Sequence, residues 1–135
     1  MMGKNSLIDG LFDNGDDVNN ITEKIIGCAF NVSNCLETGF LESVYENALV
    51  LELRKAETKV DQQKRIKVLY QGVIVGDFFA DLLVEEKVLV ELKTVRNLED
   101  VHTAQCLNYL RATNLRICLL INFGKPKVEI KRVIN

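Results

Sequence analysis

The sequence predicts an α/β fold in which a mixed β-sheet is flanked by helices, in the order α-α-β-β-β-α-β-β. Apolar residues recur at helical spacing over 21–35 and 41–55, which predicts two helices ahead of the sheet. Between 66 and 95 the pattern changes to strand-like alternation, which predicts three strands. Helical spacing returns over 100–112, and two apolar or alternating segments within 116–133 predict the last two strands.

The length and composition of the chain predict one globular domain. The chain has 135 residues, of which 47% are hydrophobic and 27% are charged. Residues 1–20 are expected to form a flexible acidic N-terminal tail, because Asp13–Asp17 is polar and offers nothing to pack. The domain itself is expected to span residues 21–135, with Asn20 or Thr22 as the N-cap of its first helix.

Charge and cysteine content exclude several classes of protein. The net charge of −2 argues against strong nonspecific binding of nucleic acid, which depends on many phosphate contacts. No segment approaches the ~20 apolar residues of a membrane span, and no signal peptide is recognisable, so we expect a cytoplasmic protein without membrane contact. The four cysteines form no CxxC pair and His102 is the one histidine, which argues against structural zinc and favours reduced thiols.

Three charged residues interrupt the apolar sequence of two neighbouring predicted strands. They are Asp81, in ADLLV, and Glu91 and Lys93, in VELK. An isolated buried charge is costly, so each of these side chains needs a partner, a metal ion or access to solvent. Because strand side chains alternate between faces, Glu91 and Lys93 lie on the same face of their strand.

The hairpin between these strands decides whether the two carboxylates meet. If residues 85–87 form a three-residue loop, Val84 pairs with Val88, and the same register places Asp81 opposite Glu91. A loop of two or four residues would instead turn Glu91 to the other face of the sheet.

Two carboxylates in such a cross-strand pair repel one another unless a cation lies between them. They suit a hard divalent ion such as Mg²⁺ or Mn²⁺, with the Leu92 carbonyl as a further ligand. Lys93 beside that ion can steady a phosphate oxygen or orient an attacking water. The alternative is a cross-strand ladder of ion pairs on an exposed face, and the hairpin alone leaves both interpretations open.

Two predicted helices carry polar faces that could complete the site. Glu42, Tyr45 and Glu46 are spaced at i, i+3 and i+4, so they share a helical face, and Glu42 or Glu46 could join the acidic shell. The later helix has a polar stripe formed by His102, Gln105, Asn108 and Tyr109. Each face could instead be an ordinary solvated surface.

Taken together, these motifs resemble the bacterial and archaeal GxxExxY family, which is placed in the PD-(D/E)XK nuclease superfamily. The family pattern stands here as Gly39, Glu42 and Tyr45, and the resemblance extends from about Ile21 to Val133. The segments that carry it are GFLESVYENAL, ADLLVEEKVLVELK, AQCLNYL and LLINFGKPKVEIKRV. The resemblance implies a restriction-endonuclease-like core and a single PD-(D/E)XK-like domain.

The resemblance also implies a chemistry, a nuclease that uses Mg²⁺ or Mn²⁺ to hydrolyse phosphodiester bonds of nucleic acid, with DNA as the expected substrate. The implied metal ligands are Asp81 and Glu91 with one acid of the preceding helix, Glu42 or Glu46, of which Glu42 is favoured because it stands in the family pattern. The implied catalytic residues are Lys93, Gln105 and Tyr109, and the expected substrate-binding residues are Arg96 and Tyr45. The alternative is a catalytically silent module of the same fold that binds nucleic acid or protein, and a homodimer is compatible with either.

Overall fold

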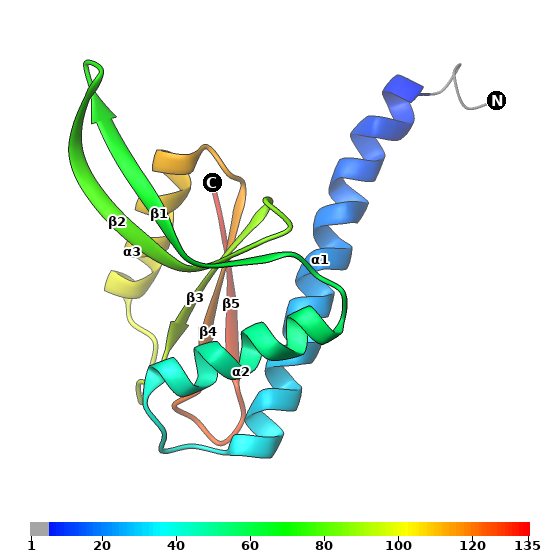
Figure 1. Cartoon of the computed structure of the whole chain (residues 1–135), viewed down its shortest axis with the longest axis vertical. Helices are drawn as coiled ribbons and strands as arrows, with labels where there is room; N and C mark the ends of the chain where they lie inside the picture. The colour runs from blue at the N-terminus through cyan, green and yellow to red at the C-terminus, as the bar shows by residue number, and fades with distance from the viewer. Residues whose placement is uncertain (1–5) are drawn as a thin grey trace.

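In the computed structural model, helices cover both faces of a five-stranded sheet (Figure 1). The structure describes residues 6–135, with side chains described from Asp17 onward. The elements are α1 (Ser6–Leu36), α2 (Glu42–Lys55), β1 (Val60–Tyr70), β2 (Val73–Val84), β3 (Val88–Lys93), α3 (Asp100–Thr113), β4 (Ile117–Asn122) and β5 (Glu129–Ile134). The predicted fold class and the predicted order of elements are confirmed.

The sheet is mixed and has the strand order β1-β2-β3-β4-β5. All neighbouring strands are antiparallel except β3 and β4, which run parallel. A parallel pair needs a crossover connection, and α3 supplies it. As the two central strands, β3 and β4 are buried along nearly their whole length, which explains their continuous apolar sequence.

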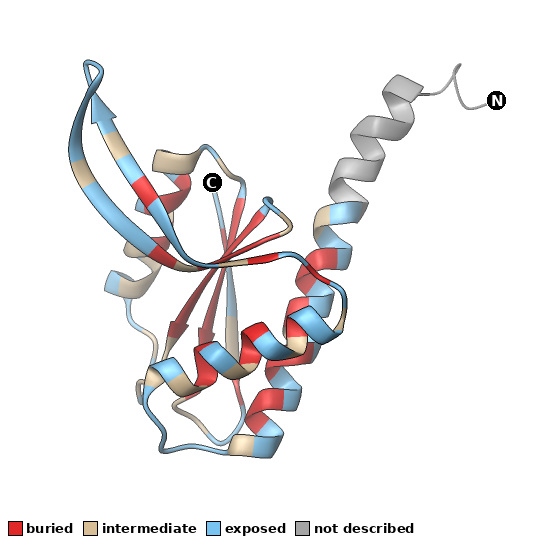
Figure 2. Ribbon diagram, in the orientation of Figure 1, coloured by how far each residue is buried: buried red, intermediate tan, exposed pale blue. Residues whose placement is uncertain are grey.

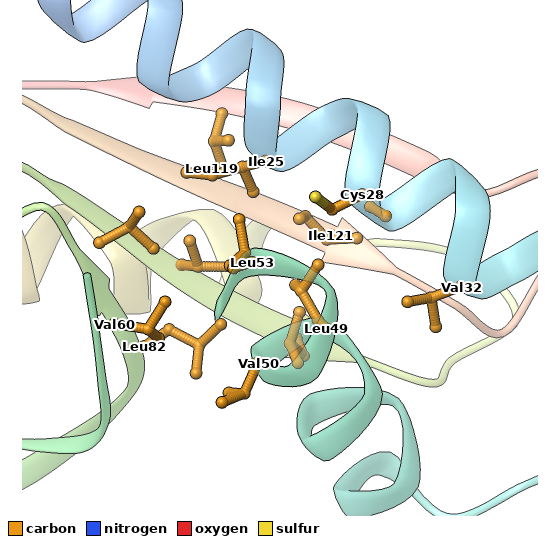
Figure 3. Packing of buried hydrophobic residues seen from close by; sticks show 14 of the residues in the cluster. Ile25, Cys28, Val32, Leu49, Val50, Leu53, Val60, Leu82, Leu119 and Ile121 are labelled. Atoms are coloured by element: carbon orange, nitrogen blue, oxygen red, sulfur yellow. The ribbon is translucent and has the colours of Figure 1, made fainter. Parts of the chain in front are cut away.

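The larger hydrophobic core lies where α1 and α2 pack on one face of the sheet. Ile25 from α1 and Leu49 from α2 belong to the same buried cluster as Leu119 and Ile121 of β4 (Figure 3). Buried positions follow the sheet-facing sides of both helices (Figure 2). This packing fixes α2, and therefore the acidic residues at its N-terminus, against the sheet.

A smaller core lies on the opposite face, beneath α3. Cys106 and Leu110 of α3 are fully buried against Leu89 and Leu120 of the central strands. The candidate residues on β3 therefore lie between two packed layers rather than on an open surface. An exposed ladder of ion pairs does not fit this arrangement.

The β1–β2 hairpin extends well beyond the rest of the sheet (Figure 1). Only residues 82–84 of β2 pair with β3, whereas β1 and β2 pair with each other along almost their full length. We refer to residues 64–80 as the hairpin arm. Its exposed large apolar residues are Leu69, Tyr70, Val73, Ile74, Val75, Phe78 and Phe79.

The first helix begins earlier than predicted. The start expected near Ile21 is wrong, because α1 begins at Ser6 and continues through most of the segment predicted as a tail. Glycine in a helix costs about 1 kcal/mol but does not end it, and the chain's one proline is Pro126. Residues 1–5 of the predicted tail lie outside the described residues. The boundary between tail and domain stays a prediction.

Thr22 is not the helix cap that the sequence predicted. It is fully buried within α1, and its hydroxyl donates to the Asn19 carbonyl at 3.0 Å. Arg132 of β5 donates to the same hydroxyl at 2.9 Å, so Thr22 joins the helix to the edge of the sheet. No helix within residues 6–135 combines the length and apolar character that a membrane span requires.

Candidate active site

The β2–β3 hairpin has the register that the sequence predicted. Val84 pairs with Val88 across a short loop, and the ladder continues to Leu82 and Val90. The next position along the ladder brings Asp81 to Glu91. There the main-chain pairing ends, because β2 turns away from β3 to form the hairpin arm. We call the point where β2 and β3 separate, at Asp81 and Glu91, the fork, and it is the candidate site.

At the fork, the side chains of Asp81 and Glu91 replace the missing main-chain hydrogen bonds. The main-chain N–H of Asp81 donates to Oε1 of Glu91 at 2.9 Å. In return, the main-chain N–H of Leu92 donates to Oδ2 of Asp81 at 2.7 Å. Each carboxylate therefore has one oxygen fixed by the partner strand, which orients both groups toward the same space.

Burial makes both carboxyl groups hard to ionise without a cation. Glu91 is only 3% exposed, and desolvation, increased by the charge of Asp81, raises its pKa to about 8. Desolvation likewise raises the pKa of Asp81 to about 6, against the lowering effect of the Leu92 N–H. Such shifts in two neighbouring acids are typical of functional sites.

The N-terminus of α2 brings two more carboxylates to the fork. The pKa of Glu42 is raised mainly by burial and further by Glu46, while the Lys93 ammonium and a hydrogen bond from the Thr94 main chain lower it. Both α2 acids also raise the pKa of Asp81. The structure thus brings together Asp81, Glu91, Lys93, Glu42 and Glu46, as the sequence predicted.

Two glutamines of β1 belong to this cluster, and sequence reasoning missed them. Gln62 Nε2 donates to Glu46 at 2.6 Å, and Gln63 Nε2 donates to Glu46 at 2.9 Å and to Asp81 at 3.3 Å. The backbone of Gln63 has a left-handed φ of 54°, which costs about 1 kcal/mol or more for a residue with a side chain. The available signal was the Gln-Gln pair, but the strand was predicted to begin only at residue 66.

Tyr45 supports the loop before α2. Its ring is fully buried and stacks on Phe123 with 4.8 Å between ring centroids. Its hydroxyl donates to the Glu37 carbonyl at 2.5 Å and accepts from the Phe40 N–H at 3.3 Å. A side chain with no exposed surface cannot contact substrate, so the substrate-binding role predicted for Tyr45 does not fit its position.

The G-x-x-E-x-x-Y spacing now has a structural explanation. Gly39 has a φ of 115°, a conformation that strongly favours glycine, and lies in the loop that Tyr45 holds. Glu42 is the first residue of the helix that follows. The glycine and the tyrosine therefore position the helix start that presents Glu42 to Lys93.

Removing the Tyr45 hydroxyl tests this supporting role. Tyr45→Phe leaves the Glu37 carbonyl and the Phe40 N–H without their partner, which we expect to lower the free energy of unfolding by about 1–3 kcal/mol. Urea denaturation measures this change. The control is Tyr70→Phe on the hairpin arm, where the side chain is 64% exposed and the expected change is below about 0.5 kcal/mol. Equal effects in the two variants would contradict the supporting role.

Two residues of α3 reach the fork from the other side. Tyr109 is 7% exposed, and Gln105 Nε2 donates to its hydroxyl at 3.1 Å. Burial raises the pKa of Tyr109, and the charges of Glu91 and Asp81 raise it further, which places its hydroxyl within their electrostatic reach. His102, from the same polar stripe, instead accepts a hydrogen bond from the Glu99 N–H at 2.9 Å and caps α3.

Asn122 fixes the segment that follows Lys93, and the sequence analysis did not single it out. Its fully buried amide oxygen accepts from the N–H groups of Val95 and Gly124, at 3.0 and 2.9 Å. A Cβ atom at Gly124 would lie 2.3 Å from the Val95 carbonyl oxygen, so only glycine fits there. Arg96 follows this fixed segment and is exposed.

The acids at the fork fit a divalent cation through their chemistry. No three Asp, Glu, His or Cys side chains in the described part of the chain already form a complete metal shell. Mg²⁺, however, commonly keeps several waters and takes only one or two carboxylates from a protein. Asp81 and Glu91 supply that pair, with the α2 acids close by.

Comparisons with known proteins identify the superfamily and similar folds. A sequence profile described as PD-(D/E)XK nuclease superfamily matches residues 19–133. Two solved structures have similar folds at 14% sequence identity: SSO0001, with a TM-score of 0.52, and an alkaline exonuclease (LHK-Exo) from Laribacter hongkongensis, with a TM-score of 0.51. Each alignment covers 69% of this chain but only 49% and 55% of those chains, respectively. Among curated protein sequences, none matches at a significant level.

Proposed function

This chain belongs to the PD-(D/E)XK nuclease superfamily, and from that premise we propose that it hydrolyses phosphodiester bonds of nucleic acid with the help of Mg²⁺ or Mn²⁺. The observation that carries the proposal is the pair of buried carboxyl groups, Asp81 and Glu91, whose pKa values are raised to about 6 and about 8. Two such acids on one face with Lys93 form a site that gains from a cation.

The proposed metal ligands are Asp81 and Glu91, together with the Leu92 carbonyl. Either Glu42 or Glu46 completes the shell. Gln62 and Gln63 donate amide hydrogen bonds to Glu46, whereas Glu42 lies near Lys93 and Thr94, so we favour Glu42. When bound, the ion supplies Lewis acidity toward a phosphate oxygen and lowers the pKa of a water molecule.

The remaining roles follow from position. Lys93, on the same face as Glu91, holds a non-bridging phosphate oxygen or orients the attacking water and offsets the charge that develops on the phosphate. Gln105 fixes the Tyr109 hydroxyl through their hydrogen bond, and we propose that this hydroxyl orients Lys93 or contacts the phosphate backbone. Within the superfamily, we propose the GxxExxY family as the subgroup and DNA as the substrate.

A silent binding module of the same fold is the second candidate. It is favoured by the fact that no complete metal shell is preformed among residues 17–135. In addition, the Gln63 amide donates hydrogen bonds to both Glu46 and Asp81, which stabilise part of their negative charge without a metal ion. The two candidates differ in whether the bound nucleic acid is cut.

A cleavage panel separates the two candidates. Wild-type protein is incubated with linear duplex DNA, single-stranded DNA and RNA, with Mg²⁺, Mn²⁺ or EDTA, above pH 8 so that Glu91 is ionised. The proposal expects products from at least one substrate with either metal and none with EDTA. Binding without products under every metal condition would instead favour the silent module.

Arg96 is the residue we propose to hold a substrate phosphate next to the fork. Replacing it with alanine should weaken binding and reduce the slope of log K against log salt by about one unit, because one phosphate contact is lost. The control is Arg116→Ala, since this exposed arginine precedes the opposite end of β4, roughly 20 Å from the Lys93 end at strand spacing. Binding isotherms at several salt concentrations measure both. An unchanged slope in Arg96→Ala would show that Arg96 is only a surface charge.

A further inference from the structure

A groove lies between the hairpin arm and α3, next to the acidic fork. It encloses about 730 Å³, which is within the range of ligand-binding pockets. Phe78 lines it from the arm, and Gln105, Tyr109 and Arg111 line it from α3. The remaining lining is mostly apolar.

We propose that this groove binds an unpaired strand of nucleic acid and leads it to the fork, with a base stacked on Phe78 and a phosphate held by Arg111. The inference rests on the proposed function and deepens it, because it specifies single-stranded or locally unpaired nucleic acid as the form that the site accepts. It also assigns a function to the exposed ring of Phe78, which the hydrolytic chemistry does not use.

The first observation is an aromatic surface that faces the groove. Phe78 is 47% exposed, although it is a large apolar residue beside a packed helix. Its ring lies 6.0 Å from that of Tyr109, centroid to centroid, at an angle of 43°, so the rings are not stacked face to face. Such a ring can stack with any unpaired base, whereas the base faces inside a duplex are already covered.

The second observation is the sign of the charge. Arg111 lines the groove from α3, whereas Lys67 pairs with Asp77 and directs its side chain to the other face of the arm. Among the described residues, no carboxylate lines the groove. The acid on the arm, Asp77, accepts three hydrogen bonds from the Arg65 side chain, at 2.7, 2.9 and 3.1 Å, so its charge is offset locally. In a chain with a net charge of −2, a groove without acids suits a phosphate backbone.

The third observation is that the groove continues into the fork. Gln105 and Tyr109 line the groove, and Tyr109 packs in the same buried cluster as Ala80 and Leu89, which lie beside Asp81 and two residues before Glu91. A strand lying along α3 would therefore meet the proposed catalytic groups directly. A protein partner or a second copy with an apolar surface would instead desolvate Arg111 without a compensating anion.

Two adjacent phenylalanines provide a matched test. Phe78 lines the groove, whereas Phe79 is the next residue of β2, points to the opposite face and is 53% exposed. We would compare Phe78→Leu with Phe79→Leu, because leucine keeps the apolar bulk and removes only the ring. Fluorescence anisotropy with EDTA present would measure binding of the same sequence as single-stranded DNA, single-stranded RNA and duplex DNA.

The inference expects Phe78→Leu to bind a single strand about 10-fold more weakly, with duplex binding and the Phe79→Leu variant little changed. Phe78→Trp should restore binding, because the larger ring keeps a stacking face. The DNA and RNA arms show which strand chemistry the groove prefers.

Other results would overturn the inference. Equal losses of single-strand affinity in Phe78→Leu and Phe79→Leu would do so, as would tighter binding of duplex than of single strands by the wild type. A dimer in sedimentation velocity that only Phe78→Leu abolishes, with strand binding unchanged, would identify a second copy as the occupant. If the wild type cleaves nucleic acid and Phe78→Leu binds a single strand as tightly as the wild type, the inference about the groove fails but the proposed function stands. If the wild type neither binds nor cleaves any substrate, the proposed function fails as well.

Discussion

Replacing Lys93 with alanine is expected to lower the rate of metal-dependent cleavage by about 10²–10⁴-fold while leaving the protein folded and able to bind metal. The ammonium group lies near Glu42 and Glu91, where it lowers the pKa of both acids, and it lies on the same face of β3 as Glu91. Removing it takes positive charge away from the reacting phosphate, but it leaves the Asp81–Glu91 hydrogen-bond exchange in place.

The matched control for this variant is Lys87→Ala. Lys87 lies just before the other end of β3 and pairs with Asp17 at the surface, so its loss should change cleavage by less than about 2-fold. Single-turnover cleavage of the best substrate from the panel measures both variants. Wild-type rates in Lys93→Ala would assign the observed cleavage to other residues or to a contaminating nuclease.

Glu91→Gln is expected to abolish cleavage and, at alkaline pH, to stabilise the metal-free protein. The pKa of Glu91 is raised from its usual 4.5 to about 8 in the folded state, mainly by burial. The stabilisation that the protonated acid provides is therefore complete below pH 4.5 and is lost as the pH rises through about 8. Glutamine stays neutral, so the variant should gain about 2–4 kcal/mol relative to wild type near pH 9 and little near pH 5.

Urea denaturation in EDTA at pH 5, 7 and 9 measures this gain. Glu23→Gln is the control, because Glu23 is exposed on α1 and should show no comparable dependence on pH. Adding Mg²⁺ at pH 9 should stabilise wild type and not Glu91→Gln, since only the wild-type acid can bind the ion as a carboxylate. A stability difference that is the same at all three pH values would show that Glu91 does not carry a buried charge.

The sequence predicted those parts of the fold that depend on local periodicity. Alternation combined with a three-residue loop, one of the loop lengths left open, predicted the Val84–Val88 register, and with it the approach of Asp81 to Glu91. The start of α1 was mispredicted because polar residues and glycines weaken a helix without ending it. Local pattern therefore located the core elements well and the helix boundary poorly.

The parts of the site that were missed depend on contacts between distant segments. Gln63 reaches Asp81 and Glu46 because β1 pairs with β2 and also contacts α2, and the Gln-Gln pair in the sequence does not indicate these two neighbours. Tyr45 lies on the predicted helical face, but its burial against Phe123 depends on how α2 packs on the sheet. Asn122 stood in an apolar strand as an unexplained polar residue, which was a usable signal.

The most direct test of the account is a crystal structure of the protein soaked in Mn²⁺ above pH 8, with anomalous diffraction measured to locate the ion. The account predicts an anomalous peak bridging the carboxylates of Asp81 and Glu91, with the Gln63 amide moved or reoriented away from Asp81, and no peak there in Glu91→Gln crystals soaked in the same way. An ordered fork without a peak at a saturating Mn²⁺ concentration, or a peak bound only elsewhere on the molecule, would contradict it.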